Sequence, residues 1–250
     1  MQLGPVRYSV DAKSQAAKRP FDHRLIVRET SFVSRSEPSA GTIQDYYREL
    51  VADEARNQLI IDDVIKAIQE GRSPILLTER KNHLKLLAAR LEGFVRHIVV
   101  LEGGKSRKEQ QAIFERLSRI PDDEERLILA TGKYVGEGFD DARLDTLFLA
   151  LPISFKGTLV QYTGRLHRLH PRKVEVRIFD YVDRGVPMLL NMFENRLRGY
   201  RAIGYARHES PLGFAPPPPE EPTIEYDEEA LRHFDEEGSQ DEQDLPEDDE

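Results

Sequence analysis

The stretch RLILATGKYVGEGFD, from Arg126 to Asp140, joins an aliphatic run to a glycine-rich segment. Continuous aliphatic residues from Leu127 to Ala130 indicate a short strand that is buried on both faces of a sheet. The glycines that follow suit a tight turn at the carboxyl end of that strand. In open α/β sheets, ligands bind at this edge. The stretch therefore predicts a parallel sheet with a site where this strand ends.

Strands and helices are predicted to alternate on both sides of this stretch. Short runs rich in Val, Ile and Leu predict strands at Ile75–Leu77, Val95–Leu101, Arg126–Ala130, Thr146–Ala150 and Val174–Val182. Apolar residues at helical spacing predict helices at Asn82–Leu91, Lys108–Leu117, Thr158–Leu166 and Pro187–Tyr200. Alternation of this kind is typical of a parallel sheet with helices on both faces. The fold class is therefore α/β.

The residues before this region predict a lead-in of two strands and two helices. Pro5–Val10 and His23–Arg28 alternate as half-buried strands do, but this segment has too few apolar residues for a core of its own. We expect it to pack either on the following domain or on one further upstream. Helices follow at Gln44–Leu50, with Thr42 as N-cap, and at Glu54–Glu70, where Gly71 supplies the stop. The expected domains are residues 1–72, 73–205 and 206–250.

Charge is distributed unevenly along the 250 residues, whose net charge is −9. The segment Glu220–Glu250 holds 16 acidic residues and a single basic one, so the remainder of the chain carries +6. A mildly basic body suits a polyanionic partner such as nucleic acid. The acidic tail follows a proline-rich spacer, Ala215–Pro219, and its composition predicts disorder. A partner-binding role for the tail, or masking of the basic body, is the alternative.

Composition also limits the class of protein. The chain contains no cysteine, which excludes disulfides and thiolate zinc sites. No apolar run approaches the roughly 20 residues of a membrane span, and no export signal follows Met1. We therefore expect a cytoplasmic protein that does not contact membranes.

The second informative segment is QYTGRLHR, from Gln161 to Arg168. Arg165 and Arg168 are three residues apart on a predicted helix, so both guanidinium groups project from one face. Two permanent cations with forked donors suit a polyphosphate whose charge grows during transfer. Gly164, just before Arg165, would let another backbone approach closely. For an arbitrary pair of helical arginines, solvated surface charge would be the simpler interpretation.

The two segments together resemble motifs V and VI of superfamily-two helicases. The order is a strand, then Thr131, then a Gly-Phe-Asp loop, and about 20 residues later the Gln-x-x-Gly-Arg-x-x-Arg pattern. Gln161 stands where DEAD-box proteins have His. In this respect the motif is closer to the restriction-enzyme, repair and chromatin-type members. The resemblance covers roughly Pro74 to Val182 and implies a RecA-like fold, that of the second motor domain.

The resemblance also implies roles for individual residues. Arg165 and Arg168 would be arginine fingers that reach the γ-phosphate of ATP held by another RecA-like domain. Gln161 would lie at the same cleft, together with Gly138, Asp140 and Gly164. Thr131, Thr78, Arg80 and the Gly104 turn would contact the phosphate backbone of nucleic acid, with little sequence preference. DNA is the favoured partner, although the sequence specifies neither the strand type nor the polarity.

No phosphate-binding P-loop is predicted. Gly104-Lys105-Ser106 ends like a Walker A motif, but Val99 stands where that motif requires its first glycine. We also expect no Asp-Glu-x-x magnesium motif of the Walker B kind. ATP and Mg²⁺ would then be held mainly by a Walker-bearing domain, either in another chain or in an upstream segment. We predict negligible ATPase activity for this polypeptide alone.

Three functions are compatible with these patterns. The first is the motor domain of an ATP-dependent helicase or translocase that works with a Walker-bearing partner. The second is a non-catalytic nucleic-acid- or protein-binding module of the same ancestry. The third is a scaffold that acts through the proline spacer and the tail. His167 and His170 are expected to be polar surface or nucleic-acid-facing groups, and no metal site is predicted.

Overall fold

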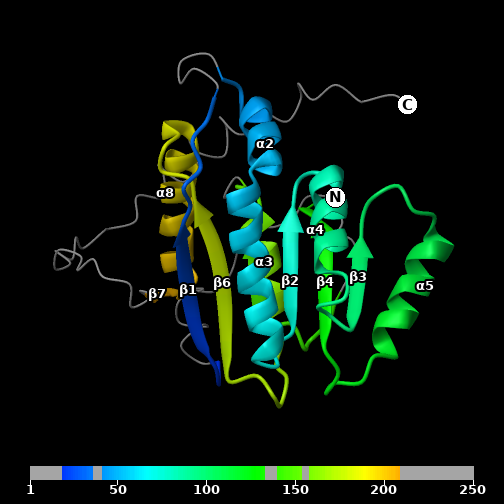
Figure 1. Cartoon of the computed structure of the whole chain (residues 1–250). Helices are drawn as coiled ribbons and strands as arrows, with labels where there is room; N and C mark the ends of the chain where they lie inside the picture. Colours follow the sequence, from blue (N-terminus) through cyan, green and yellow to red (C-terminus); the bar gives the residue numbers. More distant parts are fainter. Residues whose placement is uncertain (1–18, 36–40, 133–139, 154–157, 209–250) are drawn as a thin grey trace, which may run out of the picture. The chain divides into compact units, whose positions relative to one another are not determined.

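The computed structural model describes residues 19–35, 41–132, 140–153 and 158–208. Its strands are β1 (Asp22–Glu29), β2 (Pro74–Thr78), β3 (His97–Leu101), β4 (Arg126–Thr131), β5 (Thr146–Leu149), β6 (Glu175–Val182) and β7 (Ala206–His208). Its helices are α2 (Ile43–Ala52), α3 (Glu54–Gln69), α4 (Lys81–Leu91), α5 (Arg107–Ser118), α7 (Thr158–Leu166) and α8 (Pro187–Ala202) (Figure 1). Each helix and each strand from β2 to β6 agrees with the sequence prediction to within a few residues.

These strands form one sheet in the order β3-β4-β2-β5-β6-β1-β7, and every neighbouring pair is parallel. Helical crossovers are the usual connection between parallel strands, since a tight hairpin turn cannot join them. The predicted α/β class with a parallel sheet is confirmed. Because all strands run the same way, the residues that follow β2, β3, β4, β5 and β6 meet at one carboxyl edge.

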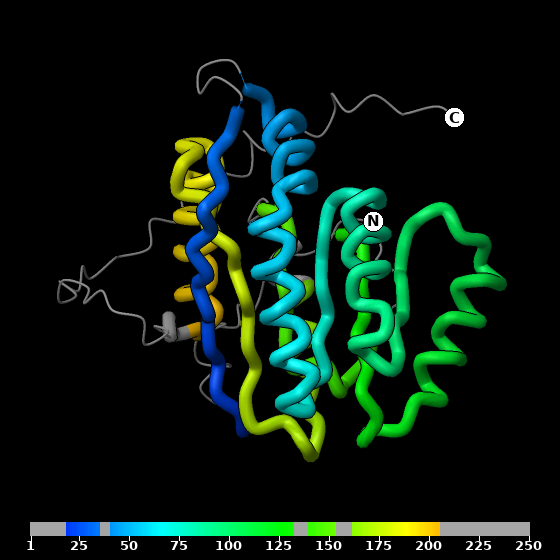
Figure 2. Tube along the Cα trace, viewed as in Figure 1, coloured from blue at the N-terminus to red at the C-terminus, as the bar shows by residue number. Residues whose placement is uncertain are grey.

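The position of β1 settles where the lead-in segment packs. β1 pairs with β6 along its whole length, from Asp22 opposite Glu175 to Glu29 opposite Val182, and its other side pairs with β7. Figure 2 shows this blue strand beside the yellow-green one, although some 150 residues separate them in the chain. Of the two alternatives, packing on the following domain is therefore the one that the fold adopts. The strand predicted at Pro5–Val10 and the acidic tail lie outside the described residues.

Two helical layers cover the sheet because successive side chains of a strand point to opposite faces. On one face, Leu76 and Leu129 pack under α3 and α4, which lie in front of the sheet in Figure 1. On the other face, Ile75 and Ile128 belong to a cluster that includes residues of α5, α7 and α8. These side chains are at most 2% exposed, so the centre of the sheet is shielded on both faces.

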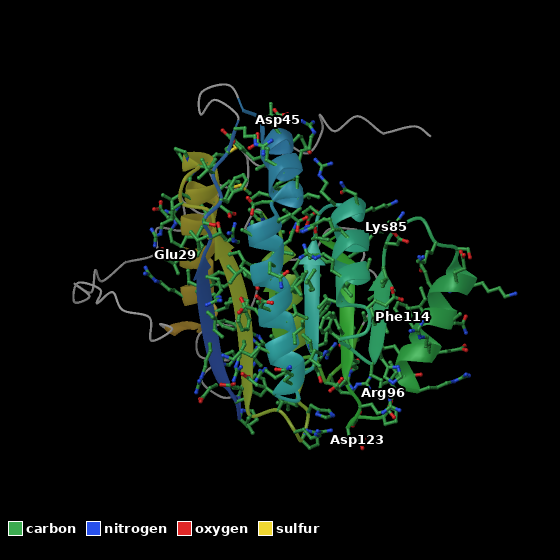
Figure 3. The ribbon with its side chains drawn as sticks, viewed as in Figure 1. Glu29, Asp45, Lys85, Arg96, Phe114 and Asp123 are labelled. Carbon is green, nitrogen blue, oxygen red and sulfur yellow. The ribbon has the colours of Figure 1, made fainter. Side chains whose placement is uncertain are left out.

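A third apolar cluster lies at the carboxyl edge. Leu50 of α2 packs with Leu151, just after β5, and with Val186 and Leu189 around the start of α8. Asp45, near the start of α2, marks this edge in Figure 3, and Arg96 and Asp123 lie toward the opposite one. The cluster holds α2 at this edge, where Gln44 contacts Arg80, one of the predicted site residues.

Local signals at the helix ends behave as predicted. Thr42 caps α2, because its hydroxyl accepts the Asp45 amide at 3.3 Å while the Asp45 carboxylate accepts the Thr42 amide. Gly71 has φ of +73°, the left-handed conformation that ends α3. Among the described helices, none has both the length and the apolar composition that crossing a bilayer requires.

Candidate functional site

The junction between β4 and α7 is the structural centre of the candidate site. Thr131 ends β4 and is buried, and the Gly132 carbonyl accepts a 2.6 Å hydrogen bond from the Tyr162 hydroxyl. A Cβ at Gly132 would lie 2.8 Å from that hydroxyl oxygen and still closer to the Glu79 carboxylate. Burial raises the pKa of Tyr162, which keeps its hydroxyl protonated as a donor. A side chain at position 132 would therefore force Glu79 or Tyr162 to move, so close packing favours glycine there.

The two predicted arginine fingers lie together where α7 ends. Arg168 follows the helix, and its guanidinium pairs with Asp140 at 3.0 Å in an exposed contact. Arg165, in the last turn, forms no ion pair within the described parts of the chain, and its Nε is buried without a hydrogen-bond partner. Burial lowers the pKa of Arg165, and the nearby Arg168 lowers it further while Asp140 opposes both. As far as the described residues go, Arg165 is thus a partly desolvated cation without a direct ion pair.

The other residues predicted for the nucleotide side are described only in part. Gly164 is exposed, and a Cβ at that position would have no atom within 4 Å, so its flank is open. Gln161 lies on α7, but its side chain is outside the description, as are Gly136 and Gly138. Asp140 lies beside Arg168, in the exposed ion pair described above.

Thr78 is turned into the protein interior at the end of β2. Its hydroxyl lies 3.0 Å from Nδ1 of His83, and Nε2 of His83 lies 2.8 Å from the Asn57 side-chain oxygen. Thr78 and His83 are both 0% exposed, and burial lowers the pKa of His83 to about 3. The hydroxyl of Thr78 is therefore engaged in a buried network with a neutral imidazole, an arrangement that favours a structural role.

Arg80 lies near the same edge and is half-buried against α2. Its guanidinium contacts the Gln44 side chain and lies 5.8 Å from the centre of the Tyr47 ring. Tyr47 in turn donates a 2.5 Å hydrogen bond to the Pro152 carbonyl, just after β5. Gly104, with φ of +93°, turns the chain after β3, and a Cβ there would lie 3.8 Å from the Lys81 amino group. Arg80 and Lys81, at the junction of β2 and α4, thus place two cations near the carboxyl edge.

The structure therefore divides the predicted residues between two places. Thr78, Arg80, Gly104 and Thr131 belong to the carboxyl edge, whereas Arg165, Arg168 and Asp140 gather where α7 ends. Tyr162 connects the two places, since it is bonded to Gly132 and stands one helical turn before Arg165. The prediction from sequence did not single out Tyr162, although its spacing of three from Arg165 was a visible signal.

The expectation that His167 faces the surface or nucleic acid is wrong. Its Nδ1 lies 2.6 Å from the Arg19 guanidinium, and its Nε2 lies 2.9 Å from the Tyr205 hydroxyl. The His23 ring meets it edge-on, with 4.8 Å between ring centres, and burial lowers the pKa of His167 to about 3. His170 lies 3.4 Å from Asp122. No group of three metal-ligating side chains occurs among the described residues.

Asp-Glu pairs do occur in the chain, which corrects the expectation that the simple Asp-Glu-x-x pattern is absent. Asp53-Glu54 is the clearest described case, and it stands at the start of a helix rather than at the end of a strand. Asp53 caps α3 by accepting the Arg56 amide at 2.7 Å, and Glu54 pairs with Arg90 at 2.7 Å. Both carboxylates therefore have structural partners and do not form a magnesium motif beside a phosphate loop.

Comparison with known proteins bears on this geometry. Neither models of protein families nor curated protein sequences match the chain. Among solved structures, T4 UvsW aligns with a TM-score of 0.59 and 17% identity over 75% of this chain. The Escherichia coli DEAD-box protein SrmB, solved with the regulator of ribonuclease activity A, aligns with a TM-score of 0.52 and 12% identity over 80% of this chain. The chain therefore shares the fold of these two structures, which is the RecA-like α/β fold.

The alignment with this chain covers 41% of the T4 UvsW chain and the whole of the SrmB chain. The predicted fold is thereby confirmed. At these identities the two structures support the arrangement of the sheet and its helices. The roles of individual residues rest on the contacts described above.

Proposed function

We propose that this RecA-like domain is the second motor domain of an ATP-dependent nucleic-acid helicase or translocase. ATP and Mg²⁺ are held mainly by a Walker-bearing RecA-like domain in another chain or another segment. Arg165 and Arg168 act as arginine fingers that stabilise the charge developing on the γ-phosphate during transfer. Gln161, Gly138, Asp140 and Gly164 belong to the same side of the nucleotide. DNA is the expected track, and the domain alone has negligible ATPase activity.

The observation that carries the proposal is the state of Arg165. Its Nε is buried without a hydrogen-bond partner, and within the described chain no carboxylate pairs with its guanidinium. An arginine that serves only to stabilise its own domain is normally paired when it is desolvated. A guanidinium left in this state, beside an exposed Arg168, supports a role in completing an anion site on another domain.

The nucleic-acid side of the proposal uses the carboxyl edge. Arg80 and the backbone around Thr131 and Gly104 contact phosphate and sugar, so binding depends strongly on salt and weakly on sequence. Thr78 contributes by holding the start of α4 through its hydrogen bond with His83, and it does not contact the nucleic acid. The hydrogen bond from Tyr162 to Gly132 connects the helix that carries Arg165 with the residue after β4, and so supports coupling between the nucleotide side and the nucleic-acid side.

The test is partner-stimulated ATP turnover. The domain is combined, fused or in trans, with a Walker-bearing first RecA-like domain of a superfamily-two helicase, and single-stranded DNA or RNA is added. Arg165→Ala and Arg168→Ala should each lower the stimulated kcat by about 100-fold or more. Arg90→Ala, on α4 across the sheet, is the matched control and should leave kcat unchanged.

Three other outcomes would redirect the proposal. If both arginine variants keep the stimulated rate of the wild type, the arginine-finger role is wrong. If the domain binds single strands in a salt-dependent way but no partner yields stimulated turnover, a non-catalytic binding module is supported. If deletion of residues 216–250 alone abolishes partner binding, the scaffold function is supported instead.

A further inference from the structure

Lys173 is a buried residue that caps the carboxyl end of α7. Its ammonium group donates hydrogen bonds of 2.7 Å to the carbonyls of Leu166 and of Arg168. Lys173 is 6% exposed, and its amino group lies 5.6 Å from the centre of the Phe21 ring. The last carbonyls of a helix have no partner within the helix, so a cation placed here satisfies them and interacts well with the helix dipole.

Burying this ammonium group is unfavourable by itself. No carboxylate lies within ion-pair distance of Lys173 in the parts of the chain that are described. Desolvation lowers the pKa of Lys173 to about 8, although Asp145 and Asp141 oppose that shift from further away. Lys is rarely this buried without a paired carboxylate. Among the described residues, the direct contacts that offset this cost are two backbone carbonyls and the Phe21 ring, and both carbonyls lie at the end of α7.

His167, one of the two residues between the arginines, is anchored as well. His167 is held by Tyr205 and Arg19 on its two ring nitrogens. Phe21 and His23, at the start of β1, pack on the same group. The backbone from Leu166 to Arg168 is therefore fixed through its carbonyls by Lys173 and through the His167 side chain by the segment that leads into β1.

We propose that Lys173 is the positioning residue for the arginine pair, holding the carbonyls that flank His167 so that Arg165 and Arg168 project from a fixed backbone. This inference rests on the proposed function for its catalytic consequence. Misplacement of an arginine by about 1 Å is enough to lower the rate of a positioned reaction by about 100-fold. Lys173 touches neither nucleotide nor nucleic acid in this scheme.

The first experiment measures the end of α7 without any partner. Amide hydrogen exchange is followed in the full chain for the wild type and for Lys173→Met, which keeps the apolar stem and removes the donors. Exchange at His167 and Arg168 should become about tenfold faster, while amides of α3 keep their wild-type rates. Lys66→Met, an exposed lysine of α3, is the matched control and should change neither. Unchanged exchange at His167 and Arg168 would overturn the inference.

A second variant covers the case in which Lys173→Met does not fold. Lys173→Gln keeps one amide donor on a shorter stem, and it should give faster exchange confined to the same two amides. If exchange instead rises uniformly through α3 and α7, Lys173 supports the fold as a whole and the positioning role is wrong.

The second experiment separates positioning from binding. In the partner-stimulated assay, Lys173→Met should lower kcat about tenfold or more while KM for ATP and Kd for a single-stranded oligonucleotide stay at wild-type values. Loss through a raised KM, or wild-type kcat, contradicts the inference. If Arg165→Ala also has no effect in that assay, the proposed function fails. The exchange result then still decides whether Lys173 holds the backbone of this segment.

Discussion

The Tyr162 hydroxyl donates a 2.6 Å hydrogen bond to the Gly132 carbonyl and so ties α7 to the residue that follows β4. The contact is buried and joins elements whose residues are 30 apart in the chain. It links the end of a central strand at the carboxyl edge with the helix that carries Arg165. A shift of Gly132 would therefore be transmitted to α7 through this hydrogen bond, and a shift of α7 would likewise reach Gly132.

The first prediction concerns this bond. Tyr162→Phe removes the donor and leaves a buried carbonyl unpaired, so the free energy of unfolding should fall by about 1–3 kcal/mol. Gly132→Ala should also destabilise the protein, because its Cβ meets the Tyr162 hydroxyl at 2.8 Å and the Glu79 side chain. Urea unfolding of both single variants and of the double variant provides the measurement. The double variant should lose less stability than the two single losses combined, and strict additivity would show that the two positions are not in contact.

The second prediction compares how substitution of Arg165 and of Arg168 changes the free energy of unfolding. Arg165 has no ion-pair partner in the described chain, so Arg165→Gln should change the free energy of unfolding by less than about 0.5 kcal/mol. Arg168→Gln removes an exposed pair with Asp140, which is worth at most about 1 kcal/mol. Thermal melts of the folded variants check both values. A loss of several kcal/mol for Arg165→Gln would assign that side chain to the domain's own core instead of a second domain.

The third prediction concerns the buried ion pair at the carboxyl edge. Arg56 and Asp183 are both 0% exposed in their side chains, with 3.0 Å between Nε and Oδ1, and Arg56 also donates to the Ala150 carbonyl. Arg56→Met leaves a buried carboxylate without its cation and should cost about 3–5 kcal/mol. Adding Asp183→Asn should recover part of that loss, because it removes the unpaired charge.

The control for that experiment is a surface pair of the same chemistry. Arg90→Met breaks the contact with Glu54, whose side chain is 77% exposed, and should cost no more than about 1 kcal/mol. Chemical denaturation of the variants at constant pH measures all of these differences. Equal losses for Arg56→Met and Arg90→Met would contradict the burial argument.

The fourth prediction is a dependence of stability on pH. Burial lowers the pKa of His83 and of His167 to about 3 in the folded protein, whereas the unfolded chain titrates near 6.5. Between these values the unfolded state binds more protons than the native state. The stability from the neutral imidazoles is thus complete above about pH 6.5 and is lost as the pH falls toward 3.

Each of these histidines should contribute a slope of up to about 1.4 kcal/mol per pH unit within that window. Urea unfolding measured at several pH values from 7 to 4 gives the slope of the free energy of unfolding against pH. His83→Gln should reduce this slope by the contribution of one histidine. Carboxylates also contribute to the slope, but equally in both proteins. A slope that His83→Gln leaves unaltered would mean that the imidazole is protonated in the folded state.

Local signals in the sequence were enough to predict the alternation of strands and helices, the limits of most elements, the caps at Thr42 and Gly71, and the arginine spacing on α7. These features are local, because hydrophobic period, cap chemistry and turn residues act over a few positions. The packing of distant segments was needed to show that β1 lies between β6 and β7, that Thr78 bonds to His83, and that Lys173 caps the end of α7. It also left Arg165 without an ion-pair partner in the described chain while pairing Arg168 with Asp140. The choice of partner for a polar side chain depends on which distant segments the packed sheet brings within 3 Å, and no spacing along the chain carries that information.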